Sequence, residues 1–411
     1  MERRTVAVPG NSIANAGAEA ARVSDAGSQD KYFSVVTVNH FHAKDVFLLS
    51  DYFIPRCTHY FLFTFGQSNE FGSSNSIQFS EYHRGKLVRE KVIVRNQWAG
   101  GFFVRSIQLV FWFTLFALLV APRRSWIMTP HPPVCLFQKA LRILKQQKFV
   151  FIIADIFHYD SKDWSGAIFN KYIRYCARTI DHVFYMSLDI QKRHDVFADG
   201  ERKPLVRKRW SLGIKRRFDD GGFAMKAQHM RDARTTTLGY VGVVRSCVGL
   251  ESLIEYARLN ENIRVDVVGE GCYAAELIKR CRDSGVDRRV IFHGYLATGE
   301  LEALAAEWVC GTMLYDLDQT LYTRHTEPGK AKLYLSLGVP VLMTDVSYIV
   351  DEVRRHKAGI VLSGNDPVMV KGAVETLRRD YLDYANGVAA MAKEYDYQSK
   401  YDDDFAFMRQ S

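Results

Sequence analysis

The stretch TEPGKAKLYLSLGVPVLMTD, residues 326–345, places charged side chains at the mouth of an apolar segment. Glu327 and Lys330 fall at the start of a predicted helix that ends at Gly338, before a predicted buried strand. A lysine in the first turn opposes the helix dipole, whereas the free N–H groups there attract anions. The segment therefore predicts an anion site that includes Lys330. Glu327 is either a ligand contact or a carboxylate that favours the helix N-terminus.

Other reactive side chains follow predicted strands in the first half of the chain. Asp155 ends the apolar run 149–155, and His158 follows it closely. Desolvation at the lip of an apolar strand raises the pKa of a carboxylate, which suits a general base; a helix N-cap is the structural alternative. Three more histidines lie at strand ends, where each either lines a cleft or hydrogen-bonds within its loop: His40, His42 and His131.

The cysteines and acids predict no metal site. Seven cysteines are scattered without a C-x-x-C pair or zinc-like histidine spacing, which favours a reducing compartment and small buried side chains. Asp316 and Asp318 have the spacing of a D-x-D pair, but they lie deep in the second half and are interpreted as loop acids.

The net charge of +9 is unevenly distributed, with basic clusters in 81–148 and 201–217. Such clusters suit nucleic acid, anionic lipid or phosphorylated substrates. Nucleic acid is disfavoured because no recognition helix, zinc finger or RNP-type aromatic motif accompanies the charge. Part of the excess is also expected to be ordinary solvated surface.

An apolar stretch at 106–121 lies between Arg105 and the pair Arg123–Arg124. It is shorter than the roughly 20 residues that cross a bilayer. Three interpretations remain open: a buried core helix, a helix lying in a membrane interface, and a crossing helix. Residues 1–31 are rich in Ala, Gly and Ser and lack an apolar core, so we expect a disordered leader and no secretory signal.

Short β-branched or aromatic runs alternate with longer helical runs in two successive series. In the first half the predicted strands are 32–40, 59–66, 86–94, 125–130, 149–155 and 181–187. In the second half they are 237–242, 264–271, 289–294, 310–316, 340–345 and 359–364. Buried strands that alternate with helices predict an α/β fold with parallel, doubly wound sheets.

The length of 411 residues fits two such Rossmann-like domains facing a cleft. We expect the first of these domains at 32–213 and the second at 214–390. Residues 391–411 are expected to pack back toward the first domain.

Several blocks of the second half resemble GT-B glycosyltransferases, in particular the broad group that includes glycosyltransferase family four and bacterial exopolysaccharide glycosyltransferases. GYVGVVRSCVGLESLIEYA (239–257) is similar to the opening strand, loop and helix of their donor-binding domain. Three blocks then follow in the family's order: VDVVGEG (265–271), VIFHGYL (290–296) and ELEALAAEWVCGTMLYD (300–316). PGKAKLYLSLGVPVLMTD (328–345) is similar to the family's P-x-K-x-x-E-Y-L-x-x-G-x-P-V block, the most specific match.

The resemblance implies that the anion is the diphosphate of a nucleotide sugar, which is a substrate, so that no cofactor and no essential metal are expected. The resemblance also implies that the domain at 32–213 binds the acceptor and the domain at 214–390 binds the nucleotide sugar. Lys330 then becomes a point-charge partner of the phosphates, and Glu327 an acceptor for sugar hydroxyls. The family blocks imply further donor contacts at Gly294, Tyr295, Thr326, Pro328 and Gly329.

Two departures from the family pattern alter this expectation. Val243 and Val248 stand where the family often carries an Arg and a Lys, so we expect Arg245 and Lys330 to share the diphosphate. The family's ribose-binding Glu falls at Leu333, so we expect Tyr334 or the backbone to contact the ribose.

In inverting members of the fold an Asp, Glu or His at a strand end deprotonates the acceptor, which implies Asp155 as base with His158 as the fallback. The basic, apolar first half suggests a lipid-linked glycan acceptor and an anionic membrane surface as partners. We therefore expect a peripheral enzyme of polysaccharide biosynthesis on the inner face of the cytoplasmic membrane. The alternatives are a non-catalytic glycan-assembly scaffold, favoured by Leu333, and a nucleotide-sugar epimerase.

Overall fold

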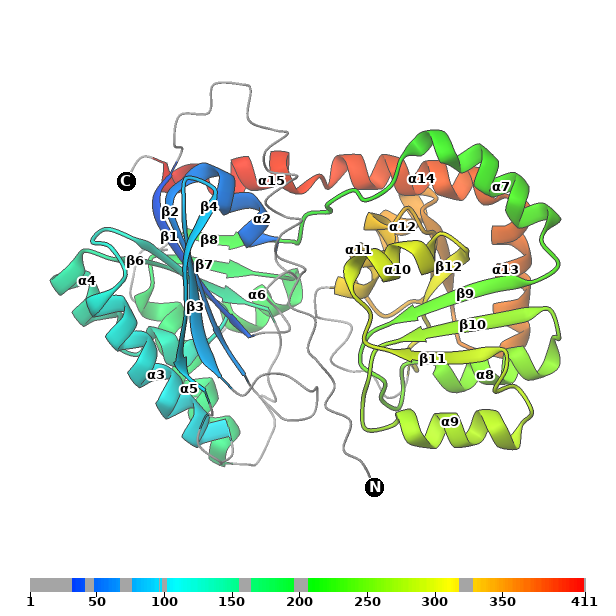
Figure 1. The fold of residues 1–411 in the computed structure, drawn as a ribbon, viewed down its shortest axis with the longest axis horizontal. Coiled ribbons are helices and arrows are strands. Elements are labelled where there is room, and N and C mark those ends of the chain that lie inside the picture. Colours follow the sequence, from blue (N-terminus) through cyan, green and yellow to red (C-terminus); the bar gives the residue numbers. More distant parts are fainter. Residues whose placement is uncertain are drawn as a thin grey trace.

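The computed structural model describes residues 32–40, 48–66, 76–95, 97, 102–154, 164–195, 206–317 and 328–409. Two helix-covered sheets form two domains that lie side by side (Figure 1). The carboxyl ends of the parallel strands in each sheet point toward the other domain (Figure 1). This arrangement confirms the predicted α/β fold with two wound sheets.

The first sheet has the order β4-β3-β2-β1-β5-β6-β7-β8. Its parallel strands are β1 (Tyr32–His40), β2 (Cys57–Phe65), β5 (Trp126–Thr129), β6 (Lys148–Ile153), β7 (His182–Tyr185) and β8 (Val206–Arg209). The helices of this half are α2 (Leu49–Phe53), α3 (Phe102–Leu119), α4 (Gln138–Lys145), α5 (Trp164–Thr179) and α6 (Leu188–Asp195).

One edge of this sheet departs from the predicted parallel pattern. β3 (Ile77–His83), which the sequence reading missed, and β4 (Lys86–Val94) form a hairpin that pairs antiparallel with β2. The turn residues Arg84 and Gly85 both have positive φ, 46° and 81°. A two-residue connection of this kind can join only antiparallel strands, which is why 86–94 is a strand but not a parallel one.

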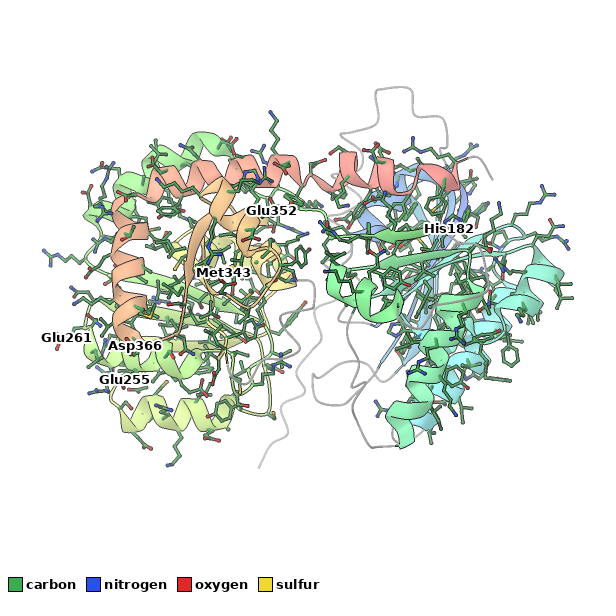
Figure 2. The ribbon with its side chains drawn as sticks, turned by 180° about the vertical axis from the view of Figure 1, so that it is seen from behind. His182, Glu255, Glu261, Met343, Glu352 and Asp366 are labelled. Carbon is green, nitrogen blue, oxygen red and sulfur yellow. The ribbon has the colours of Figure 1, made fainter. Side chains whose placement is uncertain are left out.

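The second sheet is wholly parallel, with the order β11-β10-β9-β12-β13-β14. Its strands are β9 (Thr236–Val241), β10 (Ile263–Val268), β11 (Val290–Gly294), β12 (Trp308–Met313), β13 (Val341–Thr344) and β14 (Gly359–Leu362). The helices are α7 (Phe223–Asp232), α8 (Leu250–Leu259), α9 (Ala274–Asp283), α10 (Thr298–Ala305), α11 (Gly329–Ser336), α12 (Val350–His356), α13 (Pro367–Arg379) and α14 (Tyr381–Glu394). The buried core of this domain includes Met343 at its centre (Figure 2).

The chain order of the second sheet places its topological switch between β9 and β12. The chain winds from β9 through β10 to β11 on one side, and then returns to β12 on the other side of β9. Ligands of open α/β sheets bind outside the carboxyl ends of the strands at such a point. The loops that follow β9 and β12 are therefore the first place to look for a site.

The chain ends on the first domain. Helix α15 (Tyr397–Asp404) and the short turn Ala406–Met408 run along its surface (Figure 1). Tyr401 and Phe405 share a buried core with Tyr52, Phe53 and Trp210. The C-terminal segment is thus part of a core built mainly by the first half of the sequence.

Two segments that cross between the domains pair with each other. The N–H of Ile214 donates to the carbonyl of Tyr395 at 2.7 Å, and the N–H of Tyr397 donates to the carbonyl of Ile214 at 3.2 Å. A Cβ on Gly213 would lie 2.4 Å from the Cα of Tyr397, so only glycine allows this approach. The two crossings therefore form one joint.

Helix α3 is buried on one side and exposed on the other. Leu109, Phe113, Phe116 and Ala117 pack against the first sheet, as a core helix should. The exposed side carries an apolar stripe at a spacing of four residues: Ile107, Phe111, Leu115 and Leu119. No helix in the described part of the chain combines the length and apolarity needed to cross a membrane.

Candidate active site

The loops after β9 and β10 meet backbone to backbone beside the switch point. Gly242 has a φ of 143° and Gly269 a φ of 123°, which L side chains rarely adopt. A Cβ on Gly269 would lie 2.1 Å from the carbonyl oxygen of Gly242. The N–H of Gly242 in turn donates to the carbonyl of Val268 at 2.9 Å. The glycines thus leave the floor of this edge to backbone atoms, because they add no side chain of their own.

Lys330 reaches across this floor from the first turn of α11. A Cβ on Gly242 would lie only 2.4 Å from the Cε of Lys330, so the lysine stem runs directly over that glycine. The ammonium donates to the Tyr240 hydroxyl at 2.7 Å and lies 4.3 Å and 5.1 Å from the ring centres of Tyr240 and Tyr315. The cation therefore faces β9 and the loop after β12 within an aromatic cage, where cation–π attraction favours it.

Burial, with a smaller contribution from Arg245, lowers the pKa of Lys330 to about 7. Arg245 itself is exposed, and it hydrogen-bonds the Tyr315 hydroxyl, opposing the burial that raises the pKa of that phenol. Two cations from separate elements thus converge beside the N-terminus of α11, whose first N–H groups have no intrahelical acceptor. This combination suits an anion with more than one charged oxygen, such as a diphosphate.

Tyr334 has a structural place instead of the expected donor contact. The residue is fully buried, and its hydroxyl accepts from the N–H of Val241 at 2.9 Å and donates to the carbonyl of Thr312 at 3.1 Å. It therefore joins α11 to the ends of β9 and β12. With no surface left for a ribose, Tyr334 orders the site from below, and we correct its assignment accordingly.

The other described donor residues lie around the same edge. Pro328 is buried ahead of α11, and Gly329 is exposed at its start. Gly294 ends β11 with a φ of 67°, and its carbonyl accepts from the N–H of Gly269 at 2.7 Å. Tyr295 follows it and is 81% exposed, so its ring is open to a ligand. Thr326 and Glu327 lie outside the described residues.

On the first domain, the structure describes only part of the predicted acceptor side. Asp155, His158 and His42 lie outside the described residues, and only the backbone of His40 is described, as the last residue of β1. His131 follows β5; its N–H donates to Thr129 Oγ1 at 3.0 Å and its ring packs edge-to-face on Phe65 at 4.8 Å. It is therefore fixed at the carboxyl edge of the first sheet.

Sequence reasoning missed Tyr240 and Tyr315, the two rings that enclose Lys330. Both lie in or just after apolar strands, where an aromatic residue is ordinarily read as core. The signal that remained was the hydroxyl of Tyr240, because a phenol buried in a strand needs a hydrogen-bond partner. Nothing in the local sequence identifies that partner as a lysine 90 residues away.

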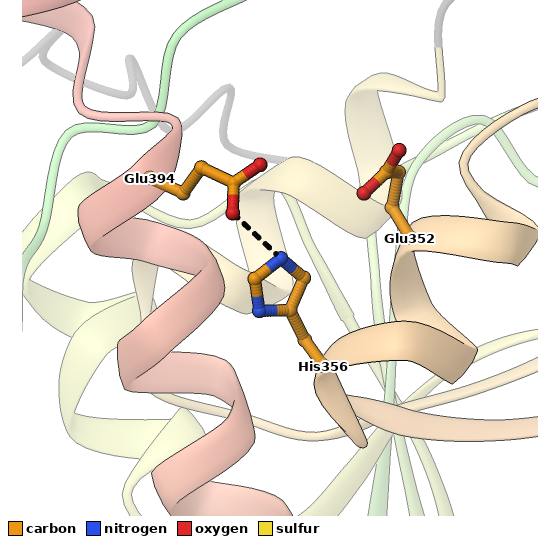
Figure 3. A group of neighbouring side chains, drawn as sticks. All are labelled: Glu352, His356 and Glu394. Carbon is orange, nitrogen blue, oxygen red and sulfur yellow. Dashed lines mark ion pairs between the residues drawn. The ribbon is translucent and has the colours of Figure 1, made fainter.

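A separate cluster brings three potential metal ligands together. Glu352 and His356 on α12 and Glu394 on α14 place ligand atoms within 4.8 Å of one another (Figure 3). However, Arg355 pairs with Glu352 and lies 2.7 Å from Glu394, whose other oxygen is 3.1 Å from His356 Nε2. The guanidinium already supplies the positive charge that the carboxylates require. We interpret the cluster as an ion-pair network that joins α12 to α14.

Comparison with known proteins gives a family match in the second domain and solved structures that share the fold. Residues 223–395 match the family model described as "Glycosyl transferases group 1". HepE from Anabaena, solved in complex with UDP-glucose, is 14% identical with a TM-score of 0.62, over 92% of this chain and 100% of that chain. No curated protein matches the chain by sequence.

Two further solved structures share the fold. Sucrose-phosphate synthase from Thermosynechococcus elongatus is 12% identical with a TM-score of 0.62, over 92% of this chain and 98% of that chain. TarM from S. aureus is 16% identical with a TM-score of 0.54, over 83% and 68%. At these identities the likeness establishes the two-domain architecture.

Proposed function

We propose that this chain, which has the GT-B fold and whose residues 223–395 match the group 1 family model, is a glycosyltransferase. It transfers a sugar from a nucleotide-sugar donor to a lipid-linked glycan acceptor in polysaccharide biosynthesis. The observation that carries the donor half of the proposal is the convergence of Lys330 and Arg245 at the topological switch of the second sheet. A diphosphate there would complete the charge balance of two cations held beside a helix N-terminus.

On the donor side, Lys330 and Arg245 bind the two phosphates, together with the N–H groups of α11. As the bond between sugar and phosphate breaks, negative charge grows on the diphosphate, and fixed cations stabilise it without reorganising. Bound phosphate also favours the charged form of Lys330. Glu327, Thr326, Gly294 and Tyr295 are proposed to contact the sugar and nucleotide.

On the acceptor side, Asp155 is the proposed base, with His158 as the fallback and His40, His42 and His131 as further contacts. A carboxylate after β6 would accept the proton of the attacking hydroxyl while the donor lies across the domain boundary. Asp155→Asn keeps the shape and removes the proton acceptor. Turnover should fall by about 100-fold or more with donor binding retained, and turnover within a few-fold of the parent would assign the base elsewhere.

The acceptor's lipid would hold the first domain at a membrane surface. The exposed stripe Ile107, Phe111, Leu115 and Leu119 on α3 adjoins α4, where Ile143 and Leu144 are 79% and 57% exposed. Exposed basic side chains lie beside them: Arg123, Arg124 and Lys139. Apolar insertion flanked by cations suits an anionic bilayer, with about 1 kcal/mol per basic residue near the surface. We propose that this face holds the enzyme on the inner side of the cytoplasmic membrane.

Incubating the protein with a panel of nucleotide sugars and a membrane lipid extract, and following nucleoside diphosphate release, tests the transfer. Release that requires both donor and extract supports a transferase. A sugar nucleotide changed without transfer indicates an epimerase, and binding without turnover indicates a scaffold. Lys330→Ala should weaken donor binding by about 1.5–3 kcal/mol, whereas Lys357→Ala, which changes an exposed lysine of the same domain, should not.

Vesicle binding tests the membrane proposal separately. The protein should bind anionic vesicles at low salt and release them as salt rises, because surface charge is screened. Phe111→Ser with Leu119→Ser should weaken this binding, and Leu259→Ser, on the 56%-exposed leucine of the second domain, should leave it unchanged. A protein that ignores anionic vesicles even at low salt does not use this face for membranes.

A further inference from the structure

Tyr240 has a hydroxyl group whose two hydrogen-bonding roles are both assigned by geometry. The side chain is 1% exposed at the end of β9. Its O–H donates to the carbonyl of Val243 at 2.7 Å, and its oxygen accepts from the ammonium of Lys330 at 2.7 Å. Burial raises the pKa of this phenol far above its usual range, so it keeps its proton.

These roles favour the charged form of Lys330. Because the Tyr240 proton is directed at a backbone carbonyl, the hydroxyl can only accept a hydrogen bond from the lysine. Both forms of the lysine carry N–H donors, but the ammonium donates a charge-assisted hydrogen bond, which is the stronger of the two. The hydrogen bond therefore favours the charged lysine and opposes the effect of burial.

The remaining described groups around the lysine come from three elements. Arg245, in the loop after β9, disfavours a second positive charge. Tyr315, after β12, offers its ring face at 5.1 Å and takes the hydrogen bond of Arg245. Glu251, on α8, acts electrostatically on Tyr240. Among these described groups, only the Tyr240 hydroxyl offers the ammonium both a short distance and a fixed direction.

We propose that Tyr240 is a positioning residue that holds Lys330 extended over Gly242, charged and aimed at the donor diphosphate. The inference rests on the proposed donor site and extends it to a residue that touches no substrate. The proposal also gives a role to the loop after β9, where Val243 and Val248 stand in place of the family's cations. The carbonyl of Val243, a residue that is 44% exposed, accepts the hydrogen bond of the Tyr240 hydroxyl. This loop therefore supports the diphosphate site indirectly, through Tyr240 and Lys330, as well as directly through Arg245.

Tyr240→Phe removes one oxygen and leaves the ring in place. Binding of UDP and GDP, used as probes, would be measured by calorimetry between about pH 6 and pH 9, and the tighter ligand followed. Without its acceptor, Lys330 should lose its proton at lower pH. At about pH 8 the variant should bind about tenfold more weakly than the parent, with a smaller difference near pH 6. This factor corresponds to the lower limit of the free energy that a hydrogen bond to a charged group contributes. Comparing the two proteins at each pH cancels the ionisation of the ligand.

Tyr381→Phe is the matched control, because Tyr381 is equally buried in the same domain and its hydroxyl has no hydrogen-bond partner among the described residues. A Tyr240→Phe variant whose affinity matches the parent, or falls equally at every pH, overturns the proposal while Lys330→Ala still reports on the donor site. If Lys330→Ala binds as the parent does, the donor site itself is wrong. Should Tyr240→Phe not fold, fluorotyrosine in place of Tyr240 keeps the ring and the hydroxyl but makes its oxygen a weaker acceptor. The UDP affinity of that protein should fall below the parent's more at about pH 8 than at about pH 6, and an affinity equal to the parent's at both overturns the proposal.

Discussion

Replacing Lys332 by Met tests how helix α11 is attached to the two segments that cross between the domains. Lys332 lies on α11, two residues after Lys330, and only 5% of it is exposed. Its ammonium donates to the carbonyl of Leu212 in one crossing segment and lies 5.3 Å from the ring centre of Tyr395 in the other. Methionine keeps most of the side-chain volume and removes the charge, so the substitution removes both of these interactions.

The expected loss follows from what the methionine cannot do. A hydrogen bond from a charged donor contributes about 1.5–3 kcal/mol, and a partly desolvated cation–π contact contributes about 0.5–2 kcal/mol. Against this, the variant no longer buries a charge, which offsets part of the loss. We expect a net destabilisation of about 2 kcal/mol. In a domain of this size that lowers the Tm by about 4–8 °C.

Thermal unfolding of Lys332→Met and Lys357→Met, followed by near-UV circular dichroism, gives the comparison. Lys357 makes the same kinds of contact, an ion pair with Asp383 at 2.8 Å and a ring contact with Tyr384 at 5.2 Å, but its side chain is 50% exposed. Exposed pairs contribute about 0–1 kcal/mol, so Lys357→Met should shift the Tm much less. Equal shifts in the two variants would refute the assignment of Lys332 as a buried tie between helix and joint.

Three further predictions concern single sites. Gly242→Ala should reduce UDP affinity, because the added Cβ would lie 2.4 Å from Lys330 Cε and the backbone there has a φ of 143°. Titration calorimetry measures this affinity, and an unchanged value would show that the lysine does not cross this glycine. His182 is stacked on Phe407 at 4.0 Å beside the C-terminal segment (Figure 2), and burial, then Lys148 and Arg142, lower its pKa from 6.5 to about 4. Between these two pH values the unfolded chain binds the proton of His182 more readily than the folded chain does. The contribution of neutral His182 to the free energy of unfolding is therefore complete above pH 6.5 and is lost as the pH falls toward 4. His182→Phe should lose less Tm than the parent over that pH range. Asp266 is 1% exposed and accepts from Trp308 Nε1 at 3.0 Å and His293 Nε2 at 2.9 Å, so Asp266→Ala should cost about 3–5 kcal/mol in denaturant unfolding, and a cost under about 1 kcal/mol would show that these donors find other partners.

The sequence by itself determined the class of the fold and the order of elements in the second domain. Apolar runs of strand length, separated by helical periods and closed by glycines such as Gly338, fix local structure, because side-chain period and backbone freedom act over a few residues. The same local reasoning put Lys330 in the first turn of α11, where a cation is unfavourable without an anion. That Lys330 and Arg245 hold a diphosphate stays a prediction.

Tertiary structure alone decided what surrounds those residues. The sheet order brings β9 beside β12, so Tyr240 and Tyr315 meet Lys330 although they are distant in sequence, and Tyr334 is used to join the two strands. The antiparallel pairing of the hairpin after β2 and the exposure of one side of α3 were likewise decided by tertiary packing. Which elements pack together sets the pairing partners and the burial. The local sequence around an apolar or aromatic residue does not show whether that residue faces the core, a cation or the solvent.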